Sequence, residues 1–224
     1  MYPESHKTEK EITTRQVAEH LVGFAEKIYE NSLGNVFEIP ALKSAPPQKK
    51  AKLSFEYYSL LHSIITLIAW NMLDATKDRQ NKIVRFYFDI CRESLIRRAK
   101  NKEQGKYLYY SLKIRRISYG KAYNTKTDKS PFSNCGQLFR KIYDLMQYES
   151  GPEVDKTGLT DKDIATMPNW WLEKYIEKDN QKEIKELLET KENIYIPLLN
   201  ITANIGNQLK KLITEEYKDV TIIN

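Results

Sequence analysis

The sequence predicts an all-α protein, an irregular bundle of about six to eight helices with a C-terminal helical subdomain. Only eight glycines and eight prolines interrupt the 224 residues, and the long stretches between them favour helices over many short strands. Apolar residues recur in most of these stretches at spacings of three and four, which indicates amphipathic helices. The hydrophobic fraction of 41% and the charged fraction of 29% are those of an ordinary globular domain.

The first helix is predicted over residues 14–32. Thr13 and Gln16 have the spacing of a capping box, and apolar residues repeat at helical spacing until Gly34, which we expect to end the helix. Residues 39–52 contain three prolines and a lysine cluster. This composition predicts a semi-extended linker.

Two further helices are predicted over about 54–76 and from Asp78, as N-cap, to about Ala99. The first contains the most apolar window of the chain, from Tyr57 to Leu73. That window is shorter than the roughly 20 apolar residues that span a bilayer. We therefore expect a helix buried in a soluble protein, and no membrane partner.

Residues 106–119 fit two patterns. Alternate residues are apolar, as in a strand, while another set recurs at helical spacing: Tyr107, Tyr110, Ile114 and Ile117. Because no partner strand is evident nearby, we predict a helix.

A boundary between subdomains is predicted at residues 150–160, where two glycines and a proline follow a helix over 137–149. It separates a helical core, residues 1–149 with a basic segment over 92–129, from a C-terminal helical subdomain, residues 160–224. The two could also pack as one domain.

The last helix is predicted from Ile194 to about Tyr217, because apolar residues recur there at spacings of three and four. The apolar, β-prone tail Val220–Ile223 is expected to pair with a neighbouring chain or to fray.

Positive charge is concentrated in residues 92–129, which hold 12 basic and 3 acidic side chains interleaved with five tyrosines. Lys and Arg neutralise phosphates, and tyrosine rings stack on unpaired bases. We therefore predict a nucleic-acid-binding protein, with RNA or single-stranded DNA favoured. The predicted binding residues are Arg97, Arg98, Lys102, Lys106, Tyr109, Lys113, Arg115, Arg116 and Lys121.

Two alternatives stay open for this segment. It could be a solvated basic face whose tyrosine rings point into the core, or it could bind an acidic protein surface. The competing function is thus a helical protein-protein interaction module, such as an adaptor, inhibitor or assembly factor. Trp170 is its expected partner anchor, because adjacent Trp170 and Trp171 point about 100° apart on a helix and interface hot spots are rich in aromatic residues.

No glycine-rich phosphate loop, nucleophile elbow or zinc-ligand spacing is present. We expect no enzyme, no metal and no small-molecule cofactor, and His62 is expected to be a hydrogen-bonded core histidine. The stretch RQVAEH, from Arg15 to His20, resembles the Arg, four residues, His signature of ribonucleases of the higher eukaryotes and prokaryotes nucleotide-binding superfamily. This resemblance implies a third function, an RNase that uses Arg15 and His20.

A second resemblance covers residues 82–123, with RFYFDI and SLKIRRISYGKAY. This stretch looks somewhat like the small helical subunits of type III CRISPR effector complexes. Those subunits line the nucleic acid, so the resemblance implies an accessory subunit of a nucleoprotein complex.

A cytoplasmic location is expected. Two cysteines, Cys91 and Cys135, are too few for a disulfide framework and are interpreted as free thiols. The first ten residues contain no apolar run of the kind a signal peptide needs.

Overall fold

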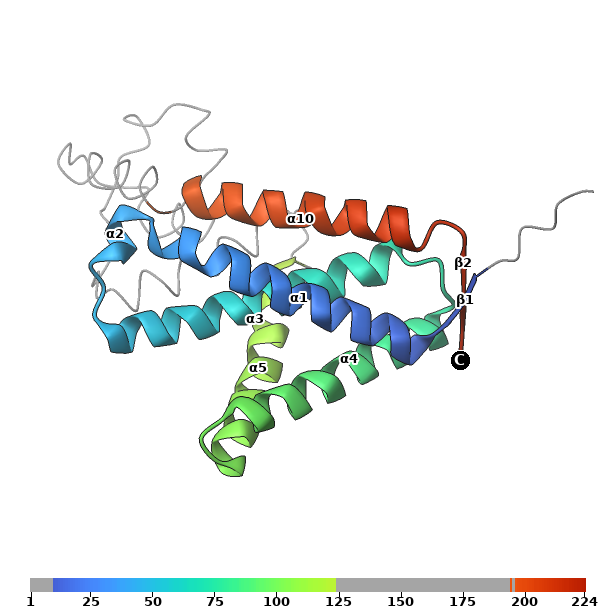
Figure 1. Cartoon of the computed structure of the whole chain (residues 1–224), viewed down its shortest axis with the longest axis horizontal. Helices are drawn as coiled ribbons and strands as arrows, with labels where there is room; N and C mark the ends of the chain where they lie inside the picture. Colours follow the sequence, from blue (N-terminus) through green and yellow to red (C-terminus); the bar gives the residue numbers. More distant parts are fainter. Residues whose placement is uncertain (1–9, 124–193, 195) are drawn as a thin grey trace, which may run out of the picture. The chain divides into compact units, whose positions relative to one another are not determined.

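The computed structural model describes residues 10–123, 194 and 196–224. Most of these residues are helical, as predicted, and one pair of short strands accompanies the helices. The elements are β1 (Lys10–Thr13), α1 (Thr14–Phe37), α2 (Pro40–Lys43), α3 (Pro47–Met72), α4 (Lys77–Arg98), α5 (Lys102–Tyr123), α10 (Ile196–Glu216) and β2 (Val220–Ile223) (Figure 1). The predicted helix over 137–149, the boundary at 150–160 and Trp170 lie outside the described residues. The predicted number of helices is therefore not confirmed.

The chain forms two compact units. The described part of the first unit is residues 10–28, 62–114 and 205–224, and that of the second is residues 29–61, 115–123, 194 and 196–204. Helices α1, α3, α5 and α10 each contribute residues to both units. Each unit thus combines segments that lie far apart in the sequence.

Helix α1 begins where the sequence predicts. The backbone N of Thr13 donates to Oε1 of Gln16 at 2.9 Å, and the backbone N of Gln16 donates to Oγ1 of Thr13 at 3.2 Å. This reciprocal pair is a capping box. One turn further on, Val17 and Leu21 are buried in the first unit, so the cap fixes the point at which an amphipathic helix enters the core.

The predicted end of this helix at Gly34 is wrong, because α1 continues to Phe37. Glycine inside a helix costs only about 1 kcal/mol relative to alanine. Val36, two residues later, is 2% exposed, and burial of a valine side chain contributes roughly 1.5–3 kcal/mol. Burial beyond the glycine therefore outweighs its cost.

The predicted linker over residues 39–52 is also wrong. Helix α2 occupies Pro40–Lys43, and α3 already starts at Pro47 and ends at Met72. A proline fits the first turn of a helix, because the N–H that it lacks would have no helical acceptor there. Leu42 is buried and holds the short helix in the second unit. No helix within the described ranges is long and apolar enough to cross a bilayer.

The predictions for α4 and α10 are confirmed with small changes at the ends. The N-cap of α4 is Thr76, not Asp78, and its hydroxyl accepts a hydrogen bond from the backbone N of Arg79 at 3.4 Å. Asp78 lies in the first turn, where a carboxylate interacts favourably with the helix dipole.

The C-terminal tail is paired within its own chain, contrary to the prediction of a neighbouring strand or fraying. Strands β1 and β2 run parallel, with Lys10 opposite Val220 and Ile12 opposite Ile222 (Figure 1). Ile12 and Ile222 are both buried. This cross-strand contact is the physical reason for the pairing.

Candidate nucleic-acid interface

Helix α4 and residues 102–114 of α5 form a hairpin in the first unit, with a turn fixed by hydrogen bonds. The backbone N of Gln104 donates to Oδ1 of Asn101 at 2.8 Å, and the backbone N of Lys100 donates to Oε1 of Gln104 at 2.9 Å. Asn101 therefore caps the N-terminus of α5. The turn sets the C-terminal half of α4 beside the start of α5 (Figure 1).

Gly105 allows the two helices to approach closely. A Cβ atom at this position would lie 2.5 Å from the Cα of Ile96, well inside the ordinary carbon-carbon contact of roughly 3.5–4.0 Å. Glycine is therefore required at this crossing unless the backbone moves.

A hollow of about 580 Å³ lies on the hairpin, within the first unit. Four cations, one carboxylate, two tyrosines and one isoleucine line it: Arg92, Glu93, Ile96, Arg97, Lys102, Lys106, Tyr109 and Tyr110. The excess of cations over carboxylates makes the hollow electropositive. It brings together four of the predicted binding residues, Arg97, Lys102, Lys106 and Tyr109.

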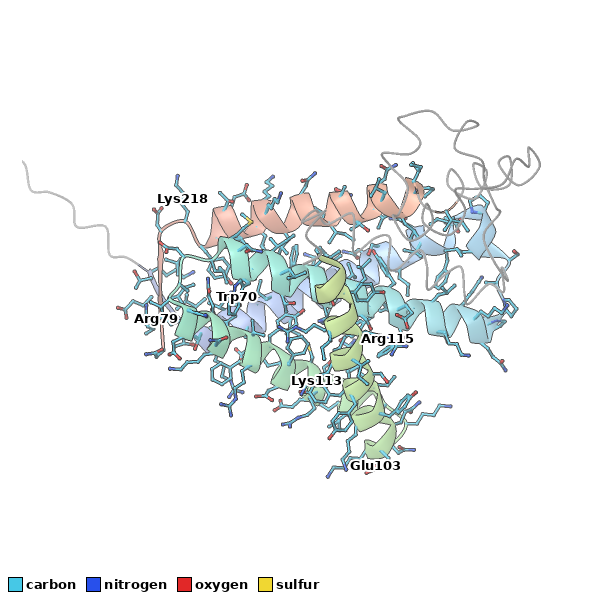
Figure 2. All side chains as sticks on the ribbon, turned by 180° about the vertical axis from the view of Figure 1, so that it is seen from behind. Trp70, Arg79, Glu103, Lys113, Arg115 and Lys218 are labelled. Atoms are coloured by element: carbon cyan, nitrogen blue, oxygen red, sulfur yellow. The ribbon has the colours of Figure 1, made fainter. Side chains whose placement is uncertain are left out.

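Three of these cations, Arg92, Arg97 and Lys102, have no ion pair with any described residue. The fourth, Lys106, donates from Nζ to Oε1 of Glu103 at 2.9 Å. This hydrogen bond raises the pKa of Lys106 and lowers the pKa of Glu103, which lies near the start of α5 (Figure 2). Such exposed pairs are weak, so an incoming anion can compete with Glu103.

Helix α5 has three distinct faces. Gly105 and Leu112 lie on the buried face. The basic residues Lys102 and Lys106 lie on the second face, since successive residues are rotated by roughly 100° around the helix axis. The third face is apolar and open to solvent, since the exposed fractions of its side chains are 70% for Tyr107, 61% for Tyr110 and 66% for Ile114.

The tyrosines of α5 therefore divide between the two interpretations of the segment. Tyr119 is fully buried, as expected for rings that point into the core. Tyr107 and Tyr110 are exposed, as expected for rings that meet a partner. Tyr109 is intermediate, and Nζ of Lys113 lies 5.6 Å from the centroid of its ring, a cation-π contact.

Other predicted binding residues have partners inside the protein. In the first unit, Nη1 of Arg98 donates to Oε2 of Glu26 at 2.6 Å, and the Glu26 side chain is 12% exposed. In the second unit, Arg115 forms an ion pair with Glu56, a carboxylate that is 8% exposed. These two arginines stabilise the fold.

Lys113 and Arg116 are not among the residues that line the hollow. Arg116 is exposed and belongs to the second unit. The side chain of Lys121 and the whole of Trp170 lie outside the described part of the structure.

Arg92 was missed by the sequence prediction, whereas Tyr107 and Tyr110 were counted among the five interleaved tyrosines but not among the predicted binding residues. Arg92 lies five residues before Arg97 on α4. Tyr107 and Tyr110 belong to the helical-spacing set that predicted the helix, and that spacing alone does not say whether an apolar face is buried. Lys106 and Lys113 directly precede Tyr107 and Ile114 in the sequence. These lysines were the signal that could have marked the face as exposed.

His62 is a hydrogen-bonded core histidine, as predicted. Its Nδ1 lies 2.6 Å from the hydroxyl of Tyr87 and 3.5 Å from Sγ of Cys91. Burial lowers the pKa of His62 to about 3 and raises the pKa of Cys91. No cluster of His, Cys, Asp and Glu suited to a metal ion occurs in the described ranges.

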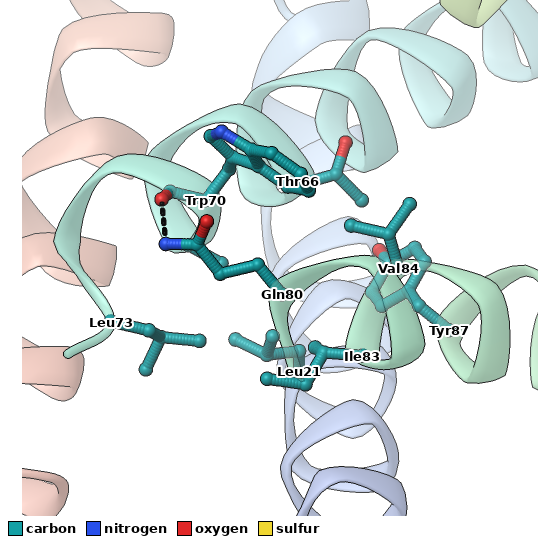
Figure 3. A pocket seen from close by; sticks show the side chains of 9 residues that line it. Leu21, Thr66, Trp70, Leu73, Gln80, Ile83, Val84 and Tyr87 are labelled. Atoms are coloured by element: carbon teal, nitrogen blue, oxygen red, sulfur yellow. Dashed lines mark hydrogen bonds between the residues drawn. The ribbon is translucent and has the colours of Figure 1, made fainter. Parts of the chain in front are cut away.

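A small cavity lies close to this cluster in the first unit (Figure 3). Leu21, Leu73, Ile83 and Val84 are among the residues that line it, and its volume is about 10 Å³. A cavity of that size holds one water molecule at most. It therefore offers no room for a substrate.

Arg15 and His20 do not form one site in the described structure. Nε of Arg15 donates to Oε1 of Glu19 at 3.1 Å, whereas Nδ1 of His20 lies 3.3 Å from the hydroxyl of Tyr217. Both side chains are exposed on α1.

No family model, curated protein or solved structure matches this chain. The two resemblances drawn from the sequence therefore stay predictions.

Proposed function

We propose that this protein binds nucleic acid through the α4-α5 hairpin, without catalysing a reaction on it. The proposal is supported by one observation above all: Arg92, Arg97, Lys102 and Lys106 surround the same hollow. Cations that share a concave surface can contact successive phosphates of one chain, and each contact releases counterions.

The salt dependence of binding follows from this number of cations. Four phosphate contacts correspond to a slope of log affinity against log salt of about −3 for a single strand. Fluorescence anisotropy of labelled single-stranded RNA, single-stranded DNA and duplex DNA across a salt series measures that slope. The same samples, analysed on a denaturing gel, test for the cleavage that the RNase hypothesis requires.

Charge-reversal variants test whether the hollow is the binding surface. One variant carries Arg97→Glu, Lys102→Glu and Lys106→Glu. The matched control carries three lysine substitutions at exposed positions elsewhere in the first unit: Lys77→Glu, Lys210→Glu and Lys218→Glu. Both variants lower the net charge equally, so a difference between them reports position, not overall charge.

We expect the hollow variant to lose binding and the control variant to retain most of it. Equal loss in both would indicate non-specific attraction to a basic protein and contradict the proposed surface. Absence of binding by the parent protein at low salt would refute the proposal and favour the acidic protein partner instead.

A further inference from the structure

We infer that the nucleic acid is an unpaired strand whose bases stack on Tyr107 and Tyr110. This inference rests on the proposed function and specifies its substrate. Both rings are largely exposed, and Tyr110 also lines the hollow that holds the four cations. One surface thus offers phosphate-binding groups next to flat aromatic faces.

The exposed rings distinguish an unpaired strand from a duplex. In a duplex each base is covered by its stacked neighbours, so a side chain in a groove meets only base edges. An unpaired base has a free face, and stacking on an aromatic side chain does not depend on which base it is. Tyr107 and Tyr110 are neighbours at i and i+3, with Cβ atoms about 5–6 Å apart, so neighbouring bases of one strand can use both.

The remaining aromatic ring of the hollow has a different role. Tyr109 is partly buried, and Lys113 lies over its ring, so we assign it to positioning Lys113. Ile114 continues the exposed apolar face by one turn. Charge complementarity indicates a nucleic-acid strand as the partner of this surface, because aromatic rings beside four cations match the alternation of bases and phosphates in such a strand.

The test compares three ligands of equal length, measured by anisotropy with the full chain: single-stranded RNA, blunt duplex, and a single strand of abasic sites. The variants are Tyr107→Ala with Tyr110→Ala, and the matched pair Tyr107→Phe with Tyr110→Phe, which keeps the rings. We expect the parent to prefer the single strand with bases. Each alanine should weaken that binding about tenfold, and the phenylalanine variant should bind like the parent.

Two further results identify which idea fails. If the alanine variant binds the single strand as tightly as the parent, or if duplex and abasic strand bind equally well, stacking is overturned while nucleic-acid binding stands. If the parent binds no nucleic acid at low salt, the proposed function itself is overturned. Because both tyrosines are exposed, the variants should fold, and circular dichroism checks that they do.

Discussion

Replacing Gly105 with alanine tests whether the close approach of α4 and α5 is real. Alanine in place of glycine inside a helix normally stabilises a protein by about 0.5–1 kcal/mol. At Gly105 the added Cβ would lie 2.5 Å from the Cα of Ile96, so reaching an ordinary carbon-carbon contact requires backbone movement of about 1 Å. Overpacking of a well-packed site costs about 1–3 kcal/mol.

We therefore expect Gly105→Ala to lower the free energy of unfolding by about 1–2 kcal/mol in total. Urea denaturation should show a lower midpoint at an unchanged slope. Gly23→Ala and Gly34→Ala are matched controls, because both glycines are exposed on α1 and an added Cβ would meet nothing within 4 Å. Both should stabilise the protein. A Gly105→Ala protein that is stabilised like the controls would refute the close approach.

Three further predictions test the fold. Because burial lowers the pKa of His62 to about 3, the unfolded chain takes up a proton below about pH 6.5 that the folded chain does not. Stability should therefore fall as the pH drops from about 6.5 towards 3, with a loss of about 2 kcal/mol at pH 5; urea unfolding at pH 7 and 5 measures it, and His62→Gln should remove this contribution. Thr13→Ala should cost about 1 kcal/mol by removing the cap of α1, whereas Thr13→Ser should retain it, as thermal unfolding can show. Arg98→Ala should destabilise the protein by about 1 kcal/mol because Glu26 loses a charged hydrogen bond, whereas Arg97→Ala should change stability by less than about 0.5 kcal/mol; denaturant midpoints compare the two.

Local signals in the sequence were sufficient to predict helix ends where burial of other residues did not outweigh them. The capping box at Thr13 marks the observed start of α1. The helical spacing of apolar residues places α4 and α10 within a few residues of their observed ends. The signals failed where burial elsewhere was stronger. Gly34 did not end α1 because Val36 is buried beyond it, and the prolines around α2 start helices there instead of preventing them.

Contacts between distant parts of the chain could not be predicted in this way. Strand β1 pairs with β2 at the other end of the sequence, and four apolar or β-branched residues give no indication of which strand they will meet. The same limit applies to α5, where two sets of apolar residues lie on different faces. The structure distinguishes them: Gly105 faces Ile96 of α4, Leu112 is buried, and Tyr107 is exposed.

The salt slope can separate the interface predicted from charge alone from the interface that the geometry supports. The sequence-derived set contains eight cations, which would give a slope of about −6 on a single strand if all contacted phosphates. Arg98 and Arg115 are held by carboxylates inside the protein, and the hollow contains four cations. A slope near −3 would match the hollow. A slope near −6 would mean that the nucleic acid also reaches cations outside it, so the binding surface would have to extend further along α5.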